Sequence, residues 1–262
     1  MTKSKESGVF SVIDQPKRPT PDKFYSVMGG KVKLRAMPDY PRAGADAVLL
    51  AAAIGADSEE TVVEAGSGSG ALALCVARRV GCRVEGIELQ SELAVLGSEN
   101  IALNDLSNRV SIHEGDIINP PSIFKLGMYD HAVANPPYFE SSSSQPSSVP
   151  CRALSHHFSH SSFEQWFHFL LSSVKPKGTV TLIGRAERIG VILKQLEGEL
   201  GDIVLFPLWP RKGTSAKLVI IRGRRGTAGP MALSSGLVLH ASDGSYTEEA
   251  EQVLRHGSGL IF

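Results

Sequence analysis

The chain contains a glycine-rich stretch, EAGSGSG at residues 64–70, between a short β-branched run and a run with helical spacing. The β-branched run at residues 61–65 predicts a strand, and residues 71–80 predict a helix. Glycines at such a turn let the backbone bend sharply and approach a ligand closely. The stretch therefore favours an α/β fold that binds a ligand at the carboxyl end of a strand, although a plain tight turn also fits it.

Segments with strand-like and helix-like patterns alternate along the rest of the chain. Strands are expected at residues 83–88, 109–113, 129–134 and 179–183, and helices at 47–54, 91–103, 163–174 and 186–200. Alternation of this kind predicts a parallel sheet with right-handed crossovers and helices on both faces. Residues 203–208 and 217–222 are expected to pair antiparallel and close the sheet. The predicted fold is Rossmann-like, with a mostly parallel central sheet and an antiparallel C-terminal strand.

The composition favours one globular domain in a reducing compartment. Residues 1–23 are polar and contain proline, which predicts a flexible tail ahead of a single domain at 24–262. Residues 141–150 are rich in serine and proline and predict a mobile loop. Three cysteines without paired spacing argue against a disulfide framework or metal site, and no apolar signal or membrane-spanning stretch is visible. We therefore expect a cytoplasmic protein with no metal and no membrane partner.

Positive charge is concentrated in two segments of a chain whose 27 cations and 27 acids balance. Residues 1–35 carry eight Lys or Arg against three acids, and residues 207–225 carry six Lys or Arg with no acid. In the second segment Trp209 lies near Arg211 and Lys212, which suits base stacking beside phosphate contact. The two segments could form a polyanion-binding face, but a solvated tail, a solvated strand edge and a partly buried tryptophan fit equally well.

Three acids lie at or near the carboxyl ends of the first three predicted strands. Glu64 directly precedes the glycines, where it would repel a pyrophosphate but suit a cationic ligand. Glu88 ends the next strand, where a carboxylate can accept both hydroxyls of a ribose. Asp116 follows the third strand and could contact an adenine amino group. The GxGxG spacing and the three acids favour S-adenosylmethionine over a dinucleotide, whereas each acid alone could be a solvated strand end.

A proline-rich tetrapeptide, Asn135-Pro136-Pro137-Tyr138, follows the fourth predicted strand. The Asn135 carboxamide oxygen and the Pro136 carbonyl could orient an amino group whose lone pair is conjugated. The prolines stiffen the segment, and Tyr138 offers an aromatic face to a planar substrate. The tetrapeptide therefore predicts methyl transfer to a planar amino group by positioning rather than by a strong base.

At these motifs the chain resembles class I methyltransferases with an NPPY motif, and specifically the bacterial tRNA(Val) adenine-N6-methyltransferase family. The similarity covers roughly residues 24–262 and includes RAGADAVLL at 42–50, with Ala45 where the family has threonine, and DGSYTEEA at 243–250. The resemblance implies S-adenosylmethionine as cofactor and an RNA substrate, with tRNA expected. The implied cofactor-binding residues are Arg42, Asp46, Glu64, Gly66, Gly68, Gly70, Glu88, Leu89, Asp116, Ile117 and Asn135.

Other acceptors also fit an asparagine that orients an amino group. A glutamine side chain presents the same donors, so a protein-glutamine N5-methyltransferase is an alternative, as is an rRNA guanine-N2 enzyme. Glutamine-methylating enzymes of the release-factor type carry a sizeable N-terminal helical domain, whereas about forty mostly polar residues precede the first apolar helix here. A DNA adenine enzyme and a binding protein without turnover are weaker alternatives, and the chain could be a monomer or a homodimer.

Overall fold

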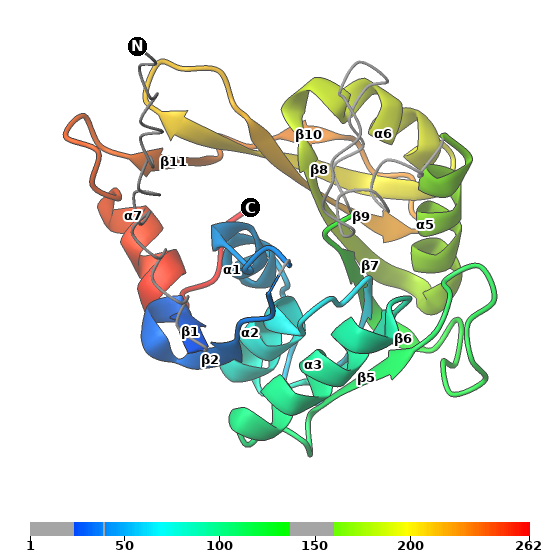
Figure 1. Ribbon diagram of the computed structural model, residues 1–262. Helices are drawn as coiled ribbons and strands as arrows, with labels where there is room; N and C mark the ends of the chain where they lie inside the picture. Colours follow the sequence, from blue (N-terminus) through cyan, green and yellow to red (C-terminus); the bar gives the residue numbers. More distant parts are fainter. Residues whose placement is uncertain (1–23, 39, 137–159) are drawn as a thin grey trace, which may run out of the picture.

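The computed structural model describes residues 24–38, 40–136 and 160–262 (Figure 1). The predicted tail at 1–23, the predicted loop at 141–150, Pro137 and Tyr138 lie outside the described residues. Within them, the main sheet has nine strands in the order β10-β8-β9-β7-β6-β3-β4-β5, with β11 also paired to β8. A separate hairpin, β1-β2, forms the other sheet.

The central strands are parallel, as the alternating pattern predicts. They are β3 (Thr61–Ala65), β4 (Arg83–Glu88), β5 (Val110–Glu114), β6 (Tyr129–Ala134) and β7 (Val174–Arg185). Strand β9 (Leu218–Arg225) runs antiparallel between β7 and β8 (Leu200–Arg211), and the short strands β10 (Ala232–Leu233) and β11 (Leu237–His240) pair parallel with β8. The predicted Rossmann-like sheet with an antiparallel C-terminal strand is thus confirmed.

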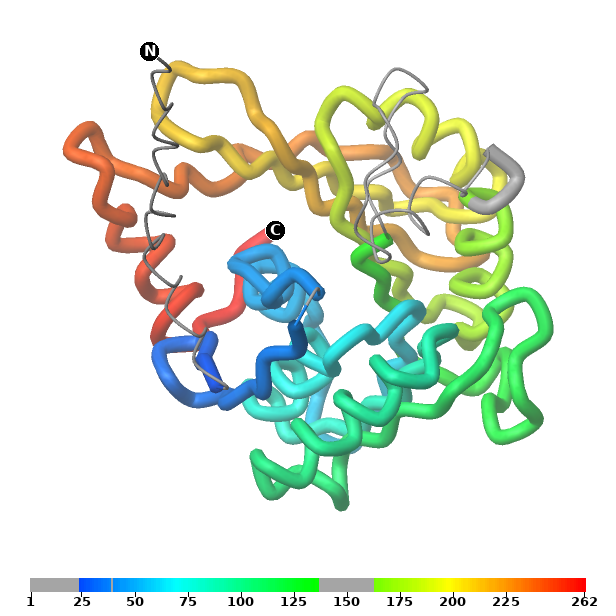
Figure 2. Tube along the Cα trace, viewed as in Figure 1, coloured from blue at the N-terminus to red at the C-terminus, as the bar shows by residue number. Residues whose placement is uncertain are grey.

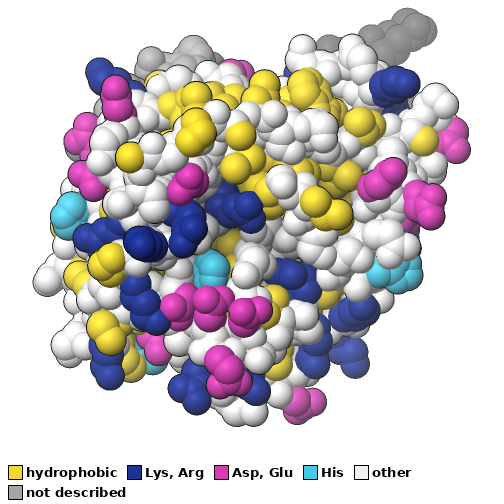
Figure 3. Space-filling model, turned by 180° about the vertical axis from the view of Figure 1, so that it is seen from behind, with side chains coloured by type: hydrophobic (Ala, Val, Ile, Leu, Met, Phe, Trp, Pro, Cys, Tyr) yellow, Lys and Arg dark blue, Asp and Glu magenta, His cyan; other side chains and the backbone are white. Residues whose placement is uncertain are grey.

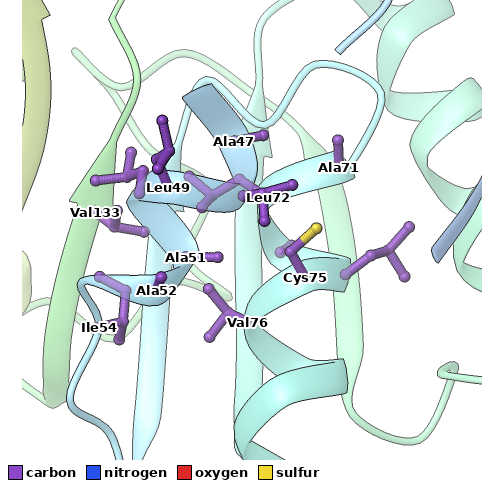
Figure 4. Packing of buried hydrophobic residues seen from close by; sticks show 14 of the residues in the cluster. Ala47, Leu49, Ala51, Ala52, Ile54, Ala71, Leu72, Cys75, Val76 and Val133 are labelled. Atoms are coloured by element: carbon purple, nitrogen blue, oxygen red, sulfur yellow. The ribbon is translucent and has the colours of Figure 1, made fainter. Parts of the chain in front are cut away.

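Helices cover both faces of the curved sheet (Figure 1). One layer holds α1 (Ala45–Ala52), α2 (Ala71–Val80) and α3 (Ser91–Leu103), and the other holds α5 (His160–Ser173) and α6 (Ile189–Leu196). The strands supply both cores by alternation, since Val62 and Val133 face the first layer while Val63 and Ala132 face the second. In the first core, small side chains let α1 and α2 pack closely, with Ala51 and Ala52 near Val76 (Figure 4).

Two sequence-based boundaries are wrong. Residues 175–178, which precede the strand expected at 179–183, already belong to β7, where the pairing with β6 shifts register and Lys177 has a φ of 64°. The helix expected at 186–200 is a 3-10 turn at Ala186–Arg188 followed by α6, which ends at Leu196 because Gly198 turns the chain with a φ of 80° into β8. The C-terminal helix α7 (Glu248–Glu251) starts where the family resemblance implies, with Thr247 as its N-cap, and continues into a π-turn at Gln252–His256.

The N-terminal hairpin of β1 (Phe24–Val27), a 3-10 turn (Met28–Gly30) and β2 (Val32–Arg35) was not predicted. It is held by two buried asparagines of α3 that substitute for a neighbouring strand. Asn104 accepts a hydrogen bond from Lys33 N at 2.9 Å and donates to Lys33 O at 2.7 Å. Asn100 accepts from Arg35 N at 2.7 Å and donates to Ser69 O at 2.9 Å. The hairpin is therefore tied to α3 and, through Asn100, to the glycine-rich loop.

We expect Asn104→Ala to lower the free energy of unfolding by about 1–3 kcal/mol, because it leaves two backbone groups of Lys33 without their buried partner. Urea unfolding followed by circular dichroism measures the change. Asn108→Ala is the matched control, since Asn108 is exposed next to the same helix. Equal stability of the two variants would contradict the bracing role of Asn104.

Candidate functional site

A cavity of about 350 Å³ lies at the carboxyl ends of β3 and β6. It is lined by six of the residues predicted from sequence, namely Arg42, Asp46, Glu64, Gly66, Gly68 and Asn135. Its opposite wall consists of the N-terminal residues that precede α1, including Tyr25, Arg35, Met37 and Tyr40. The structure therefore brings the predicted glycine loop and the predicted tetrapeptide to one hollow, together with a wall that the sequence did not indicate.

The glycine-rich loop is pressed against its neighbours. Gly66 has a φ of 66°, and a Cβ atom there would lie 2.3 Å from the Trp166 ring of α5. Trp166 is itself buried in the second core. Gly68 also has a positive φ, and its N–H donates to the Glu88 carboxylate at 2.7 Å. Glycine is thus required at residue 66 by both backbone conformation and space.

Glu64 is the most buried charged side chain of the site, with 2% of its surface exposed. One of its carboxylate oxygens, Oε2, has no hydrogen-bond partner among the described residues. Burial raises the pKa of this carboxyl well above its ordinary value; hydrogen bonding from Ser67 opposes the shift and the nearby charge of Glu88 adds to it. A buried acceptor without a partner at the wall of a cavity is suited to a ligand that brings a cation or an N–H donor.

Glu88 has a different environment from Glu64. It is 6% exposed and does not line the cavity. Its two oxygens accept hydrogen bonds from Gly68 N and, at 2.9 Å, from Gln90 N. Burial raises the pKa of this carboxyl, while the hydrogen bonds from the Gln90, Gly68 and Leu89 backbone lower it. Glu88 therefore fixes the conformation of the glycine-rich loop. Its position at a strand end did not predict this contact.

Four further predicted cofactor residues lie outside the cavity lining: Gly70, Leu89, Asp116 and Ile117. Gly70 is the N-cap of α2 and Leu89 is 53% exposed. Asp116 accepts a hydrogen bond from Ile118 N at 2.9 Å, and Ile117 packs against the second core. Leu89, Asp116 and Ile117 thus lie just after β4 and β5, and Gly70 lies at the start of α2, all beside the cavity rather than in its lining.

The tetrapeptide begins directly after β6. Ala134 pairs with Ala65, so Asn135 follows at the same level as the start of the glycine loop. Asn135 is half-buried and Pro136 is buried. The Asn135 side chain and Glu64 therefore belong to adjacent strands and line one cavity. Pro137 and Tyr138 are not among the described residues.

The N-terminal wall places the aromatic Tyr25, which sequence reasoning missed, beside the predicted Arg42. The Tyr25 hydroxyl accepts a hydrogen bond from Ala43 N at 2.9 Å, and the Arg42 guanidinium lies 5.2 Å from the centre of the Tyr25 ring. The helix expected from residue 47 begins earlier, with Gly44 as the N-cap of α1 and Asp46 in its first turn. The alternation of buried Val32 and Leu34 with exposed Lys33 and Arg35 was the available signal for this wall.

Neither a metal cluster nor a membrane helix is found in the part of the chain that the structure describes. There, no group of three or more His, Cys, Asp or Glu side chains is arranged to hold a metal ion. None of the described helices is both long and apolar enough to cross a membrane.

Comparison with known proteins gives concordant similarities. Residues 46–119 match the family model of protein-L-isoaspartate(D-aspartate) O-methyltransferase. A tRNA1(Val) (adenine(37)-N6)-methyltransferase from Aeromonas hydrophila is 29% identical over 215 residues, covering 81% of this chain and 88% of the relative. The corresponding enzyme from Shewanella putrefaciens is 30% identical over 139 residues, 53% of this chain and 58% of the relative. A solved structure titled a predicted O-methyltransferase, from Agrobacterium tumefaciens, superposes with a TM-score of 0.68 at 20% identity, covering 82% of this chain and 98% of that one.

The fold and these similarities define the chain as a class I, S-adenosylmethionine-dependent methyltransferase. The curated relatives reported above are, more particularly, tRNA1(Val) (adenine(37)-N6)-methyltransferases, and the sequence-based resemblance to that group is thereby confirmed.

We expect Glu64→Gln to stabilise the protein in the absence of ligand, and increasingly so as pH rises. Because the pKa of Glu64 is raised in the folded state, folding favours its protonated form, so wild-type stability falls as pH rises above the ordinary value of 4.5. The advantage of the variant should therefore be larger at about pH 8 than at about pH 5. Urea unfolding at both pH values, with the exposed Glu92→Gln as control, measures this; a constant difference would contradict the raised pKa.

Proposed function

We propose that the chain transfers the methyl group of S-adenosylmethionine to the N6 amino group of adenine in the anticodon loop of a tRNA. The observation that carries this proposal is that Glu64 and Asn135 line the same cavity. Glu64 offers a buried carboxylate oxygen without a partner among the described residues, and the Asn135 carboxamide offers an oxygen that can accept a hydrogen bond from an amino group. The similarity to tRNA1(Val) (adenine(37)-N6)-methyltransferases supports adenine in tRNA as the acceptor.

The residues of the cavity fit the proposed cofactor. A volume of about 350 Å³ lies in the ordinary range for small-molecule sites. Glu64 would accept the ammonium group of S-adenosylmethionine, and the Gly66–Gly68 backbone would allow close approach of its amino acid portion. Arg42 and Asp46 would border this end of the cofactor from the N-terminal wall. The cofactor, when bound, supplies an electrophilic methyl group on a positively charged sulfur.

The outer residues would contact the nucleoside part of the cofactor. Glu88 would accept hydrogen bonds from the ribose hydroxyls with the lone pairs that Gly68 and Gln90 leave free. Leu89, Asp116 and Ile117 would border the adenine ring, and Gly70 would start α2 close to the cofactor. These positions at the ends of β4 and β5 follow the general location of ligands in open parallel sheets.

The acceptor amino group would be oriented by Asn135. Its carboxamide oxygen and the Pro136 carbonyl oxygen would accept hydrogen bonds from the two N–H groups of the amino nitrogen. These hydrogen bonds increase electron density on the nitrogen and aim its lone pair at the methyl group. The two prolines would keep these acceptors preorganised, and Tyr138 would stack on the planar base. The nitrogen would form its bond to the methyl carbon while the carbon–sulfur bond breaks and S-adenosylhomocysteine leaves. The methylated nitrogen would then lose one proton to solvent water.

The proposal places the reaction in the cytoplasm, where tRNA is modified, and in one domain spanning residues 24–262. Either a monomer or a homodimer is compatible with it. The side-chain amide of a protein glutamine presents two N–H donors, as the amino group of adenine does. Asn135 alone would therefore not discriminate between these two substrates.

Direct assay separates these acceptors. The protein is incubated with radiolabelled S-adenosylmethionine, RNA from cells that lack the modification and total cell protein, and the labelled nucleoside is then identified after digestion. Label in N6-methyladenosine of tRNA is expected. Label found in protein alone, or in guanosine of rRNA, would overturn the proposed substrate while leaving the methyltransferase class intact.

Asn135→Ala should reduce the rate of methyl transfer by roughly 10²- to 10³-fold, because it removes a preorganised acceptor of the reacting amino group. Binding of S-adenosylmethionine, measured by calorimetry, should persist, since Glu64 and the glycine loop remain. Asn108→Ala provides the control for an asparagine replaced at the surface. An Asn135→Ala protein with wild-type turnover would refute the role proposed for this residue.

A further inference from the structure

The six cations of residues 207–225 do not form one surface. Strands β8 and β9 form a hairpin in which Leu208 pairs with Leu218 and Leu200 pairs with Arg225. Arg211, Lys212 and Lys217 therefore lie at the turn, whereas Arg222, Arg224 and Arg225 lie toward the opposite end of β9. At about 3.3 Å per residue, Leu218 and Arg225 are roughly 23 Å apart. The single polyanion-binding face considered from the sequence is thus divided in two.

The turn lies on the same side of the sheet as Asn135. Strand β9 is antiparallel to both β7 and β8, so β8 runs in the direction of β6 and β7 and ends at the same edge. Ala134 is level with Leu182, Ile221 and Leu205 on the successive strands. Strand rise and spacing then put Arg211 roughly 20 Å from Asn135. Figure 1 shows this hairpin projecting past the helices, with β11 alongside.

The hairpin turn is braced. Thr214 N donates to Arg211 O at 3.2 Å, and the Thr214 hydroxyl donates to the same oxygen at 2.7 Å and accepts from Arg211 N at 3.2 Å. The half-buried Trp209 donates its indole N–H to Ser235 O at 3.0 Å, so its polar atom is used inside the protein. Strand β11 adds a partner, since His240 is in register with Arg211. The backbone that carries the cations of the turn is therefore held by hydrogen bonds and by pairing with β11.

The cations of the turn are exposed, and no described carboxylate forms an ion pair with Arg211, Lys212 or Lys217. The acid that follows β11, Asp243, accepts hydrogen bonds from Ser245 N at 2.9 Å and Ser245 Oγ at 2.6 Å. Glu187, in the turn after β7, is 3.8 Å from Arg185. Because neither of these acids pairs directly with the turn, its three cations are available to a ligand.

The cations at the opposite end have structural partners. Arg225 donates to Val174 O at 2.6 Å, Arg224 donates to Lys177 O at 3.2 Å, and Arg222 lies 3.7 Å from the centre of the Phe262 ring. Lys175, beside them at the start of β7, pairs with Asp130 at 2.6 Å. On the face opposite to the view of Figure 1, basic side chains likewise gather beside acidic ones (Figure 3). These charges hold strands together, so the turn is the better polyanion contact.

We propose that the β8–β9 turn, residues 211–217, binds phosphate groups of the RNA substrate away from the nucleotide whose base enters the cavity. This inference rests on the proposed function. Three exposed cations on one turn suit several phosphates of one chain better than a single small anion. Their distance of roughly 20 Å from Asn135 exceeds the reach of one nucleotide. The turn therefore selects a long polyanion, whereas the cavity selects the amino group.

The test removes three charges from the turn with Arg211→Gln, Lys212→Gln and Lys217→Gln in one protein. The control removes three exposed lysines from elsewhere, with Lys125→Gln, Lys177→Gln and Lys194→Gln. Each full-length protein is tested for S-adenosylmethionine binding, for the affinity of unmodified tRNA across a range of salt concentrations, and for kcat and KM with that tRNA. A single variant, Lys212→Glu, serves in place of the triple variant where the latter fails to bind the cofactor.

The turn variant should bind tRNA at least about tenfold more weakly than the control near physiological salt, with the slope of log affinity against log salt shallower by about 2 to 3. Its KM for tRNA should rise while kcat and cofactor binding stay near wild type. Equal tRNA affinity and equal salt slope in the turn and control variants would overturn the inference. Wild-type protein that neither binds nor methylates tRNA would instead overturn the proposed function, so the two failures are distinguishable.

Discussion

The hydrogen bond from Gly68 N to the buried Glu88 carboxylate is the contact on which the site depends. It fixes the glycine loop to the end of β4, while Gly66 N and Ser67 N donate to Ile87 O at 2.8 and 3.1 Å. A loop held in this way leaves Glu64 at the cavity wall with an oxygen that lacks a partner. Two buried carboxylates on neighbouring strands thus differ: each Glu88 oxygen already accepts a backbone hydrogen bond, whereas Glu64 Oε2 has no partner among the described residues.

The same loop is connected to the N-terminal wall through α3. Asn100 donates to Ser69 O and accepts from Arg35 N, so a single side chain connects the glycine-rich loop to the N-terminal wall of the cavity. Asn104 repeats the contact one helical turn later on β2. Asn100 and Asn104 are both buried, and a buried amide that lost one partner would leave a costly unpaired group. The cavity therefore keeps its shape through hydrogen bonds as much as through packing.

The sequence predicted the parts of this arrangement that depend on local pattern. The alternation of strands and helices predicts the parallel sheet. Glu64 near the end of the first predicted strand and Asn135 just after the fourth are therefore expected at one edge of that sheet, where they lie. The hairpin at residues 24–35 was missed because its partners, Asn100 and Asn104, lie about seventy residues away in the chain. The bond from Gly68 to Glu88 could not be distinguished from a ribose contact, since a strand-end acid serves either purpose. Similarly, the sequence shows a basic segment at residues 207–225. Only the register of β8 and β9 shows that its cations lie at two opposite ends of the hairpin.

Residues outside the cavity must determine whether the protein acts on an RNA or on a protein substrate. An asparagine oxygen and a proline carbonyl recognise two N–H donors, and adenine and glutamine both supply them. What differs between an RNA and a protein substrate is the charge that surrounds the reacting group. The described residues place three exposed cations on a braced turn at the same edge of the sheet and tie the other cations of that hairpin to internal partners. A chain neutral overall can therefore favour a polyanion, because it is the position of its charges relative to Asn135, and not their sum, that the substrate encounters.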